Sequence, residues 1–220
     1  MDRCLVVRFN LTFNGGRMIK FNAILLLILC MSSMPLWATQ RTILVLGDSL
    51  SAGYGIEAEQ GWVNLLRLQL ASQEGSWKVI NRSISGDTTA GGLARLPPLL
   101  QEYQPQIVIL ELGSNDGLRG LSFQQMRANL QRMIDAVKAA GGQVVLVGGR
   151  LPPNYGAVYS EAFHQLFRQL AEDNGLPLVP FLLEGVAQDR SLMQQDGYHP
   201  NAAAQPHLLQ NVWMVLKDRL

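Results

Sequence analysis

The chain alternates between short apolar runs and longer amphipathic segments, and this alternation is what most constrains its fold. Strands are expected over five apolar runs, at 43–46, 77–81, 107–112, 144–147 and 178–181. Segments with apolar residues at helical spacing separate the runs and close the chain. Strands that alternate with helices favour a parallel sheet with right-handed crossovers and helices on both faces. The sequence therefore predicts one α/β domain, a three-layer α/β/α sandwich around a five-stranded parallel sheet.

Two details of the helices are also predicted. Pro97 and Pro98 fall inside the second helical segment and are expected to kink it or restart it as a second short helix, because proline lacks a backbone N–H. Asn201 precedes the last helical segment and is a plausible N-cap. The apolar faces of the helices lie within 62–70, 93–100, 123–137, 163–170 and 208–216.

Residues 1–38 differ in character from the rest of the chain. Lys20 precedes an unbroken apolar stretch at 23–31, which Pro35 and polar neighbours interrupt before Ala38. This charged, apolar, polar order is typical of a secretory signal peptide cleaved after Ala38. An uncleaved anchor is the alternative, although the stretch is shorter than the roughly 20 residues that a spanning helix needs.

Export through this signal, followed by cleavage after Ala38, would release a domain of residues 39–220 into the periplasm or outside the cell. Met18 could be the true start, which would make 18–38 the signal proper. Both cysteines, Cys4 and Cys30, would be removed, so the core of the mature domain must supply its stability without disulfides. We expect a monomer with no stable membrane span after cleavage.

Composition sets limits on the partners. The 220 residues are 48% hydrophobic and 16% charged, which suits a folded domain with a sizeable core. A net charge of +1 gives no electrostatic reason to expect nucleic acid binding. The sequence has no phosphate-binding loop, dinucleotide fingerprint or metal-spaced His/Cys cluster, so no cofactor and no metal are expected.

Polar residues follow the apolar runs, where the carboxyl ends of parallel strands meet. Ser49 follows the first run, Gly86 the second and Asn115 the third. Asp196 and His199 stand in a loop before the last helix. In parallel sheets the working groups sit just beyond the carboxyl ends of the strands, so we expect these five residues to gather at one edge.

These residue types suit acyl transfer. A serine hydroxyl is a weak nucleophile that needs a base within hydrogen-bonding reach, and histidine titrates in the right range for that task. Among the three histidines, His164 and His207 fall within expected helices, whereas His199 lies in a loop three residues after Asp196. A carboxylate at that spacing can orient the imidazole and leave its other nitrogen for Ser49.

An oxyanion also needs hydrogen-bond donors. The backbone N–H groups of Ser49 and Gly86 and the side-chain amide of Asn115 are candidates. The alternative to a role in the oxyanion hole is that Gly86 is an ordinary loop glycine and Asn115 a turn-forming residue. The role of Glu111, at the end of the third run, stays ambiguous. Other acidic residues in these loops are interpreted as loop-bracing: Asp48, Asp87 and Asp116.

Four blocks together resemble the sequence blocks of the SGNH (GDSL) hydrolase family, in the family's order. They are Gly47-Asp48-Ser49-Leu50, Ser85-Gly86-Asp87, Gly113-Ser114-Asn115-Asp116 and Asp196-Gly197-Tyr198-His199. The resemblance covers essentially all of 39–220. Longer stretches are similar to the bacterial periplasmic multifunctional thioesterase, lysophospholipase and arylesterase enzymes, among them LGDSLSAGYG, SGDTTAGGLARLP and RLPPNYG. Ser114 stands where those enzymes often have a second glycine.

The resemblance implies the flavodoxin-like SGNH hydrolase fold and a role for each block. Ser49 would be the nucleophile, His199 the base and Asp196 its orienting carboxylate. Ser49, Gly86 and Asn115 would form the oxyanion hole. The loop at 150–159 would border an acyl-chain groove and move on binding. An apolar wall of this groove could include Leu118, Leu121, Leu151, Pro152, Tyr155 and Tyr198; the alternative is that the leucines are core residues.

The expected function is hydrolysis of esters and thioesters, including aryl esters, lysophospholipids and acyl-CoA-type thioesters. One alternative is a carbohydrate O-acetyl esterase on the same fold. Another is a non-catalytic binding domain, because a fold does not imply a function. A third is a metallohydrolase using Asp48, Asp116 and His199.

Overall fold

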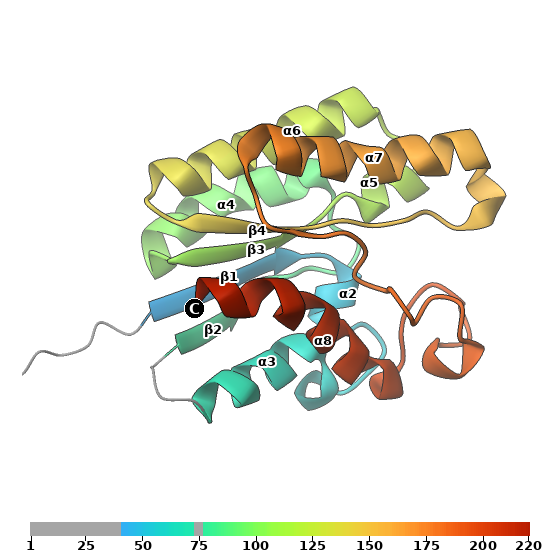
Figure 1. Ribbon diagram of the computed structural model, residues 1–220, viewed down its shortest axis with the longest axis horizontal. Helices are drawn as coiled ribbons and strands as arrows, with labels where there is room; N and C mark the ends of the chain where they lie inside the picture. The colour runs from blue at the N-terminus through green and yellow to red at the C-terminus, as the bar shows by residue number, and fades with distance from the viewer. Residues whose placement is uncertain (1–40, 73–76) are drawn as a thin grey trace, which may run out of the picture. The chain divides into compact units, whose positions relative to one another are not determined.

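The computed structural model describes residues 41–72 and 77–220. Its five strands form one parallel sheet in the order β2-β1-β3-β4-β5 (Figure 1). This is the flavodoxin-like strand order, and it confirms the predicted fold class. The strands are β1 (Arg41–Gly47), β2 (Trp77–Asn81), β3 (Ile107–Glu111), β4 (Gln143–Val147) and β5 (Leu178–Val179). The predicted signal segment and its cleavage site lie outside the described residues.

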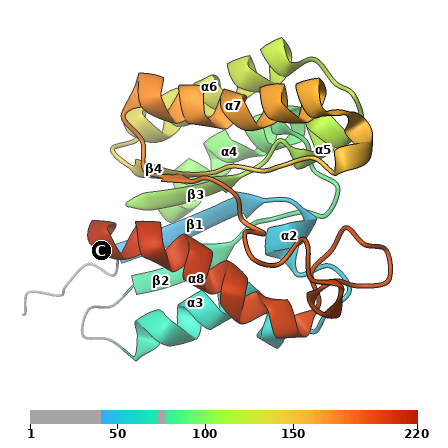
Figure 2. The same ribbon diagram turned by 45° about the vertical axis from the view of Figure 1, so that its right-hand side comes forward.

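Helices cover both faces of the sheet (Figures 1 and 2). One face carries α4 (Thr89–Tyr103), α6 (Phe123–Ala139) and α7 (Ala157–Asn174). The other carries α3 (Trp62–Ala71) and α8 (Gln205–Leu216). Two short helices, α2 (Ser49–Ala52) and α5 (Ser114–Leu118), begin where β1 and β3 finish.

The alternation of side chains along β1 explains the two layers of core. Leu44 and Leu46 point into the cluster beneath α4, α6 and α7. Ile43 and Val45 point into the cluster beneath α3 and α8. All four are fully buried, as expected for a central strand of a parallel sheet whose two faces are both covered.

The predicted restart of the second helical segment is wrong, because α4 runs as one element from Thr89 to Tyr103 with Pro97 and Pro98 inside it. Both prolines are on the exposed side. The carbonyls that lose their intrahelical partners can therefore bond to water. Leu96 and Leu100 are buried on the opposite side and hold the helix against the sheet.

Two other helix boundaries differ from expectation. Asn201 does not cap α8 directly; its side chain accepts hydrogen bonds from the N–H groups of Ala203 and Ala204 in a short 3-10 turn, Ala202–Ala204, that leads into α8. Helix α7 begins at Ala157, so part of the expected 150–159 loop is helical. Another 3-10 turn, Pro153–Tyr155, occupies most of the rest.

None of the helices in the described part of the chain combines the length and apolar character needed to cross a membrane.

Helix α3 offers a matched test of the core. Leu66→Ala is expected to lower the free energy of unfolding by about 2–5 kcal/mol, because Leu66 is fully buried and its loss leaves a cavity. Leu68→Ala, two residues away, should change it by less than about 0.5 kcal/mol, since Leu68 is 53% exposed. Urea unfolding of both variants would measure this difference. Equal losses would contradict the described orientation of α3.

Candidate active site

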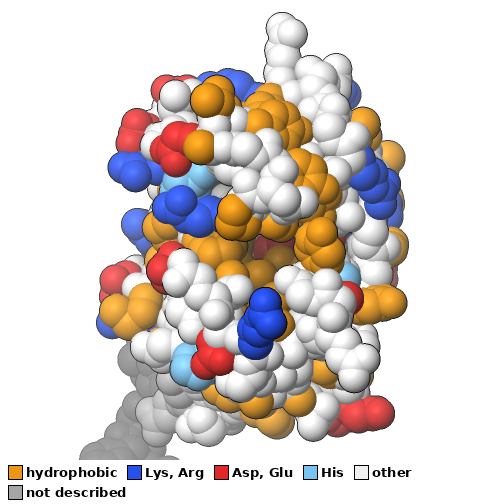
Figure 3. Space-filling model, turned by 90° about the vertical axis from the view of Figure 1, so that its right-hand side faces the viewer, with side chains coloured by type: hydrophobic (Ala, Val, Ile, Leu, Met, Phe, Trp, Pro, Cys, Tyr) orange, Lys and Arg blue, Asp and Glu red, His pale blue; other side chains and the backbone are white. Residues whose placement is uncertain are grey.

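The predicted site residues lie at the carboxyl edge of the sheet, around the ends of β1, β2 and β3. Figure 3 looks onto this edge and shows a hollow with hydrophobic side chains on its floor and along its rim. The strand order reverses between β1 and β3, and ligands of open α/β sheets bind at such a switch point. The sheet topology thus places Ser49 and Asn115 on the two sides of this point.

A tight turn presents Ser49 at the end of β1. Asp48 caps α2, with its Oδ1 accepting a hydrogen bond from the backbone N–H of Leu50 at 3.0 Å. Ser49 is therefore the first residue of a short helix, and its side chain is half-buried. A side chain at Gly47 would collide with its neighbours, since an added Cβ would lie 2.6 Å from Glu111 Oε2.

His199 links Ser49 to Asp196. Its Nε2 lies 2.9 Å from Ser49 Oγ, and its Nδ1 lies 2.6 Å from Asp196 Oδ2. The other carboxylate oxygen of Asp196 accepts the backbone N–H groups of Tyr198 at 2.9 Å and His199 at 3.0 Å. This turn needs Gly197 at a φ of 70°, a conformation that glycine adopts without a steric penalty.

The same contacts keep Asp196 ionised. Desolvation would raise the pKa of Asp196, but the hydrogen bonds from the His199 backbone, the His199 ring and the Tyr198 backbone lower it to about 2. A carboxyl whose pKa is depressed on folding stabilises the fold above its unfolded pKa of about 3.9, and this contribution is lost as the pH falls toward 2. Solvent screens the effect, because the side chain is 39% exposed.

The loop that carries His199 is fastened to the turn that carries Ser49. Gln194 donates from Nε2 to the backbone oxygen of Tyr54 at 2.7 Å, and its N–H donates to the His199 carbonyl at 2.7 Å. The ring of Tyr54 also packs on the imidazole of His199, with centroids 4.6 Å apart. The sequence alone does not single out Tyr54, because a tyrosine between two glycines carries no distinguishing signal.

Gly86 and Asn115 approach the same edge from β2 and β3. Gly86 adopts a φ of 79° after β2, and its carbonyl accepts a hydrogen bond from Arg119 Nη2 at 2.8 Å. Asn115 lies in the first turn of α5, where a loop was expected, and its Nδ2 donates to Asp48 Oδ2 at 3.1 Å. Arg119 thus joins the end of α5 to the Gly86 loop.

Two of the acidic residues interpreted as loop-bracing act in that way. Asp87 forms an ion pair with Arg95 of α4 and accepts the backbone N–H of Thr88. Asp116 is buried and accepts both the N–H and the hydroxyl of Thr89, at 2.9 and 2.6 Å. These bonds hold the loops after β2 and β3 together.

Asp48 also braces its loop, through its bonds from Leu50 and Asn115. It differs from the other two in lying beside a second buried carboxyl, Glu111, beneath the Ser49 turn. Asp48 is 1% exposed and Glu111 is 3% exposed. Glu111 accepts the Asp48 N–H at 3.2 Å and the Ser51 hydroxyl at 2.7 Å. The sequence does hold a signal for Glu111, namely an ionisable residue at the end of a run predicted to be buried on both faces.

The predicted apolar wall is only partly assembled. The Tyr155 hydroxyl donates to the Leu118 carbonyl at 2.9 Å, so these two residues meet. Leu118, Pro152 and Tyr155 are half-buried, whereas Leu121 and Tyr198 are exposed. Leu151 is 7% exposed within the core cluster beneath α4, α6 and α7, which matches the alternative that it is a core residue.

Other candidate features lie elsewhere. His164 is buried on α7, with Nδ1 3.2 Å from the Gly149 carbonyl and Nε2 3.0 Å from Arg150, and His207 is exposed on α8. Within residues 41–72 and 77–220, no group of three His, Cys, Asp or Glu side chains could hold a metal ion.

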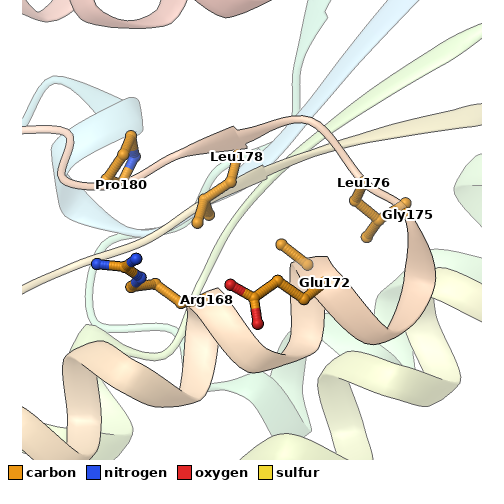
Figure 4. Close-up of a pocket in the computed structure, with 7 residues that line it drawn as sticks. Arg168, Glu172, Gly175, Leu176, Leu178 and Pro180 are labelled. Atoms are coloured by element: carbon orange, nitrogen blue, oxygen red, sulfur yellow. The ribbon is translucent and has the colours of Figure 1, made fainter.

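A cavity of about 440 Å³ lies between the C-terminal half of α7 and β5 (Figure 4). It contains none of the predicted site residues. Its lining consists of Arg168, Ala171, Glu172, Gly175, Leu176, Leu178 and Pro180.

The chain is similar to known enzymes over most of its length. It is 51% identical to "Esterase TesA" of Pseudomonas aeruginosa over 183 residues, which are 83% of this chain and 91% of that protein. It is 47% identical to "Thioesterase 1/protease 1/lysophospholipase L1" of Escherichia coli K12, over 80% of this chain and 83% of that protein. A crystal structure of the esterase EstA from Pseudoalteromonas sp., inhibited by monoethylphosphonate, superposes with a TM-score of 0.78 at 41% identity, over 81% and 98% of the two chains.

The fold and these relatives define the protein as an enzyme, a hydrolase that acts on ester bonds. The chain belongs to the GDSL-like lipase/acylhydrolase family, whose model matches residues 45–205. That range begins within β1 and ends at the start of α8, so it includes each of the four sequence blocks.

Proposed function

We propose that this protein hydrolyses carboxylic esters and thioesters through a covalent acyl-enzyme on Ser49, with His199 as general base and Asp196 as the group that orients it. The pair of contacts made by His199 carries the proposal: 2.9 Å to the Ser49 hydroxyl and 2.6 Å to the Asp196 carboxylate. An imidazole held in this way has the right tautomer to accept the hydroxyl proton and a counter-charge for the imidazolium that forms.

Acylation follows from these positions. His199 Nε2 takes the proton as Ser49 Oγ attacks the carbonyl carbon, and the carbonyl π electrons move onto oxygen. The N–H groups of Ser49 and Gly86 and the Nδ2 of Asn115 would donate to this oxyanion. When the oxyanion collapses, the C–O or C–S bond to the leaving group breaks, and His199 gives its proton to the departing oxygen or sulfur.

Deacylation repeats the sequence with water. A water molecule gives a proton to His199 and attacks the acyl carbon, and a second oxyanion forms in the same place. Its collapse releases the carboxylic acid and returns the proton to Ser49 Oγ. The half-buried position of Ser49 supports this step, since the acyl group is held at a place that water can still reach.

We further propose that the acyl chain lies in the hydrophobic hollow at this edge (Figure 3). The half-buried residues Leu118, Pro152 and Tyr155 would form its wall. Tyr198 would lie beside His199, with the core residue Leu151 behind the wall. Such a wall favours medium- to long-chain acyl groups, as in lysophospholipids or acyl thioesters. The esterase and the thioesterase/lysophospholipase among the relatives support the same substrate classes.

The proposal includes export. The charged, apolar, polar order of residues 1–38 supports a signal peptide removed after Ala38. The intact mass of the protein recovered from the periplasm or medium measures this directly. A mature chain that begins at Thr39 is expected, and a retained N-terminus would favour the anchor.

The test combines a serine-directed phosphonate with a substrate panel. Treatment with a p-nitrophenyl alkylphosphonate should abolish hydrolysis and leave one adduct, which peptide mass spectrometry should locate on Ser49. Activity should rise from p-nitrophenyl acetate to the octanoate. A preference for acetate would instead favour the O-acetyl esterase. An intact protein with neither hydrolysis nor adduct would favour the binding domain.

A further inference from the structure

Asp48 and Glu111 form a buried pair of carboxyls directly beneath the proposed nucleophile. Burying a charge is costly unless it is paired, and two carboxylates at one site cannot both ionise freely. No ion pair to either carboxyl is found in the described part of the chain. We therefore expect one of the two carboxyls to be protonated.

The hydrogen bonds give the two carboxyls different tasks. Glu111 Oε2 accepts from the Asp48 N–H and the Ser51 hydroxyl, which flank Ser49 on both sides. Asp48 accepts from the Leu50 N–H through Oδ1 and from Asn115 Nδ2 through Oδ2. The bond from the Asp48 N–H to Glu111 Oε2, at 3.2 Å, makes the two residues neighbours, and a protonated carboxyl is the member of such a pair that can donate.

The surroundings favour Glu111 as the protonated partner. Burial, followed by the negative charge of Asp48, raises the pKa of Glu111 well above its usual range. Burial also raises the pKa of Asp48, to about 6, against the lowering effects of the Leu50 N–H, the charge of His199 and the Asn115 amide. The charge of Asp87, a residue paired with Arg95, adds a small upward contribution.

We propose that Asp48 and Glu111 share one proton, held on Glu111, and act together as positioning residues for the oxyanion hole. An ionised carboxylate only accepts hydrogen bonds, so Asp48 turns the Asn115 amide to present its nitrogen, and the second N–H of that nitrogen stays available for the substrate oxyanion. Neutral Glu111 holds the turn that carries the Ser49 N–H. The inference rests on the proposed function.

Two isosteric variants separate the tasks. Glu111→Gln is expected to keep kcat within about three-fold, because glutamine copies the acceptor and donor of a neutral acid. Asp48→Asn is expected to lower kcat by about 10–100-fold with little change in KM, because asparagine lets the Asn115 amide turn over and part of a donor is lost. Equal losses in the two variants, or an unaffected Asp48→Asn, would overturn the proposal.

A stability measurement separates positioning from bracing. A carboxyl whose pKa is raised on folding destabilises the fold as the pH rises from its unfolded pKa of about 3.9 toward 6. Asp48→Asn should therefore unfold at a temperature no lower than wild type at about pH 8, while its kcat falls. Replacement of a residue that only braced the fold would lower both the unfolding temperature and kcat. Glu111→Leu removes the hydrogen bonds to the turn, so it should lower both the unfolding temperature and kcat.

A double-mutant cycle tests the link to Asn115. If Asp48 acts through that amide, Asp48→Asn combined with Asn115→Ala should be no slower than Asn115→Ala alone. Additive losses would mean that Asp48 acts elsewhere, and would overturn this part of the proposal.

Infrared difference spectra measure the shared proton without using activity. The band of a protonated carboxylic acid should persist at neutral pH in the wild type and in Ser49→Ala, and should be absent in Glu111→Gln. Its absence from folded wild type would overturn the proton sharing. A wild type that shows the band but neither hydrolysis nor a phosphonate adduct would overturn the proposed function and leave the shared proton standing.

Discussion

Ser49→Ala is expected to lower kcat for p-nitrophenyl butyrate by about 10⁶-fold and to leave KM little changed. The hydroxyl is the only group that the described residues hold at 2.9 Å from His199 Nε2, so its removal leaves the base without a nucleophile to activate. The remaining acceleration would come from the oxyanion donors and from binding. Steady-state kinetics and phosphonate labelling together measure the effect, since the variant should form no adduct.

Ser72→Ala is the matched control for that experiment. Ser72 is exposed at the C-terminal end of α3, and its hydroxyl donates to the Gln69 carbonyl at 2.7 Å. Its kcat should equal that of the wild type. If Ser49→Ala kept more than about one-hundredth of the wild-type kcat, the nucleophile would have to be another group.

His199→Ala is expected to lower kcat by about 10⁴–10⁶-fold, because no other base in the described structure contacts the Ser49 hydroxyl. Ser49 itself remains, so a phosphonate adduct should still form, but much more slowly than in the wild type. The residual rate should rise with pH as hydroxide replaces the missing base. This combination distinguishes the loss of the base from the loss of the nucleophile.

Two further variants serve as comparisons for His199→Ala. His207→Ala, on the exposed side of α8, should keep the wild-type kcat. Asp196→Asn should lower kcat by about 10⁴-fold, because an amide favours the wrong imidazole tautomer. The Asp196 carboxyl, with its pKa of about 2, stays ionised between about pH 5 and 8, so its titration cannot cause a loss of activity within that range. A wild-type rate in His199→Ala would contradict the proposed mechanism.

Helices α4 and α5 are the elements where tertiary packing most clearly overrides local sequence rules. Local rules predict that Pro97 and Pro98 kink a helix or restart it, yet burial of Leu96 and Leu100 on the inner side holds α4 as one element. Local rules also predicted a loop at Asn115, where one helical turn forms after Gly113 at a φ of 123°. In both places the outcome depends on which side of the backbone meets the core, and no local pattern records that.

The sequence by itself determined the order of strands and helices, the parallel sheet and the residues that gather at its carboxyl edge. These follow from apolar periodicity and from the rule that strands of a parallel sheet end together. Only the tertiary structure decided that Asp48 and Glu111, 63 positions apart in the chain, lie within hydrogen-bonding distance beneath Ser49. It also decided that Leu151 belongs to the core and that Tyr54 packs on His199. The physical reason is that burial and proton sharing depend on contacts between distant segments, which exist only once the sheet has brought β1 and β3 together.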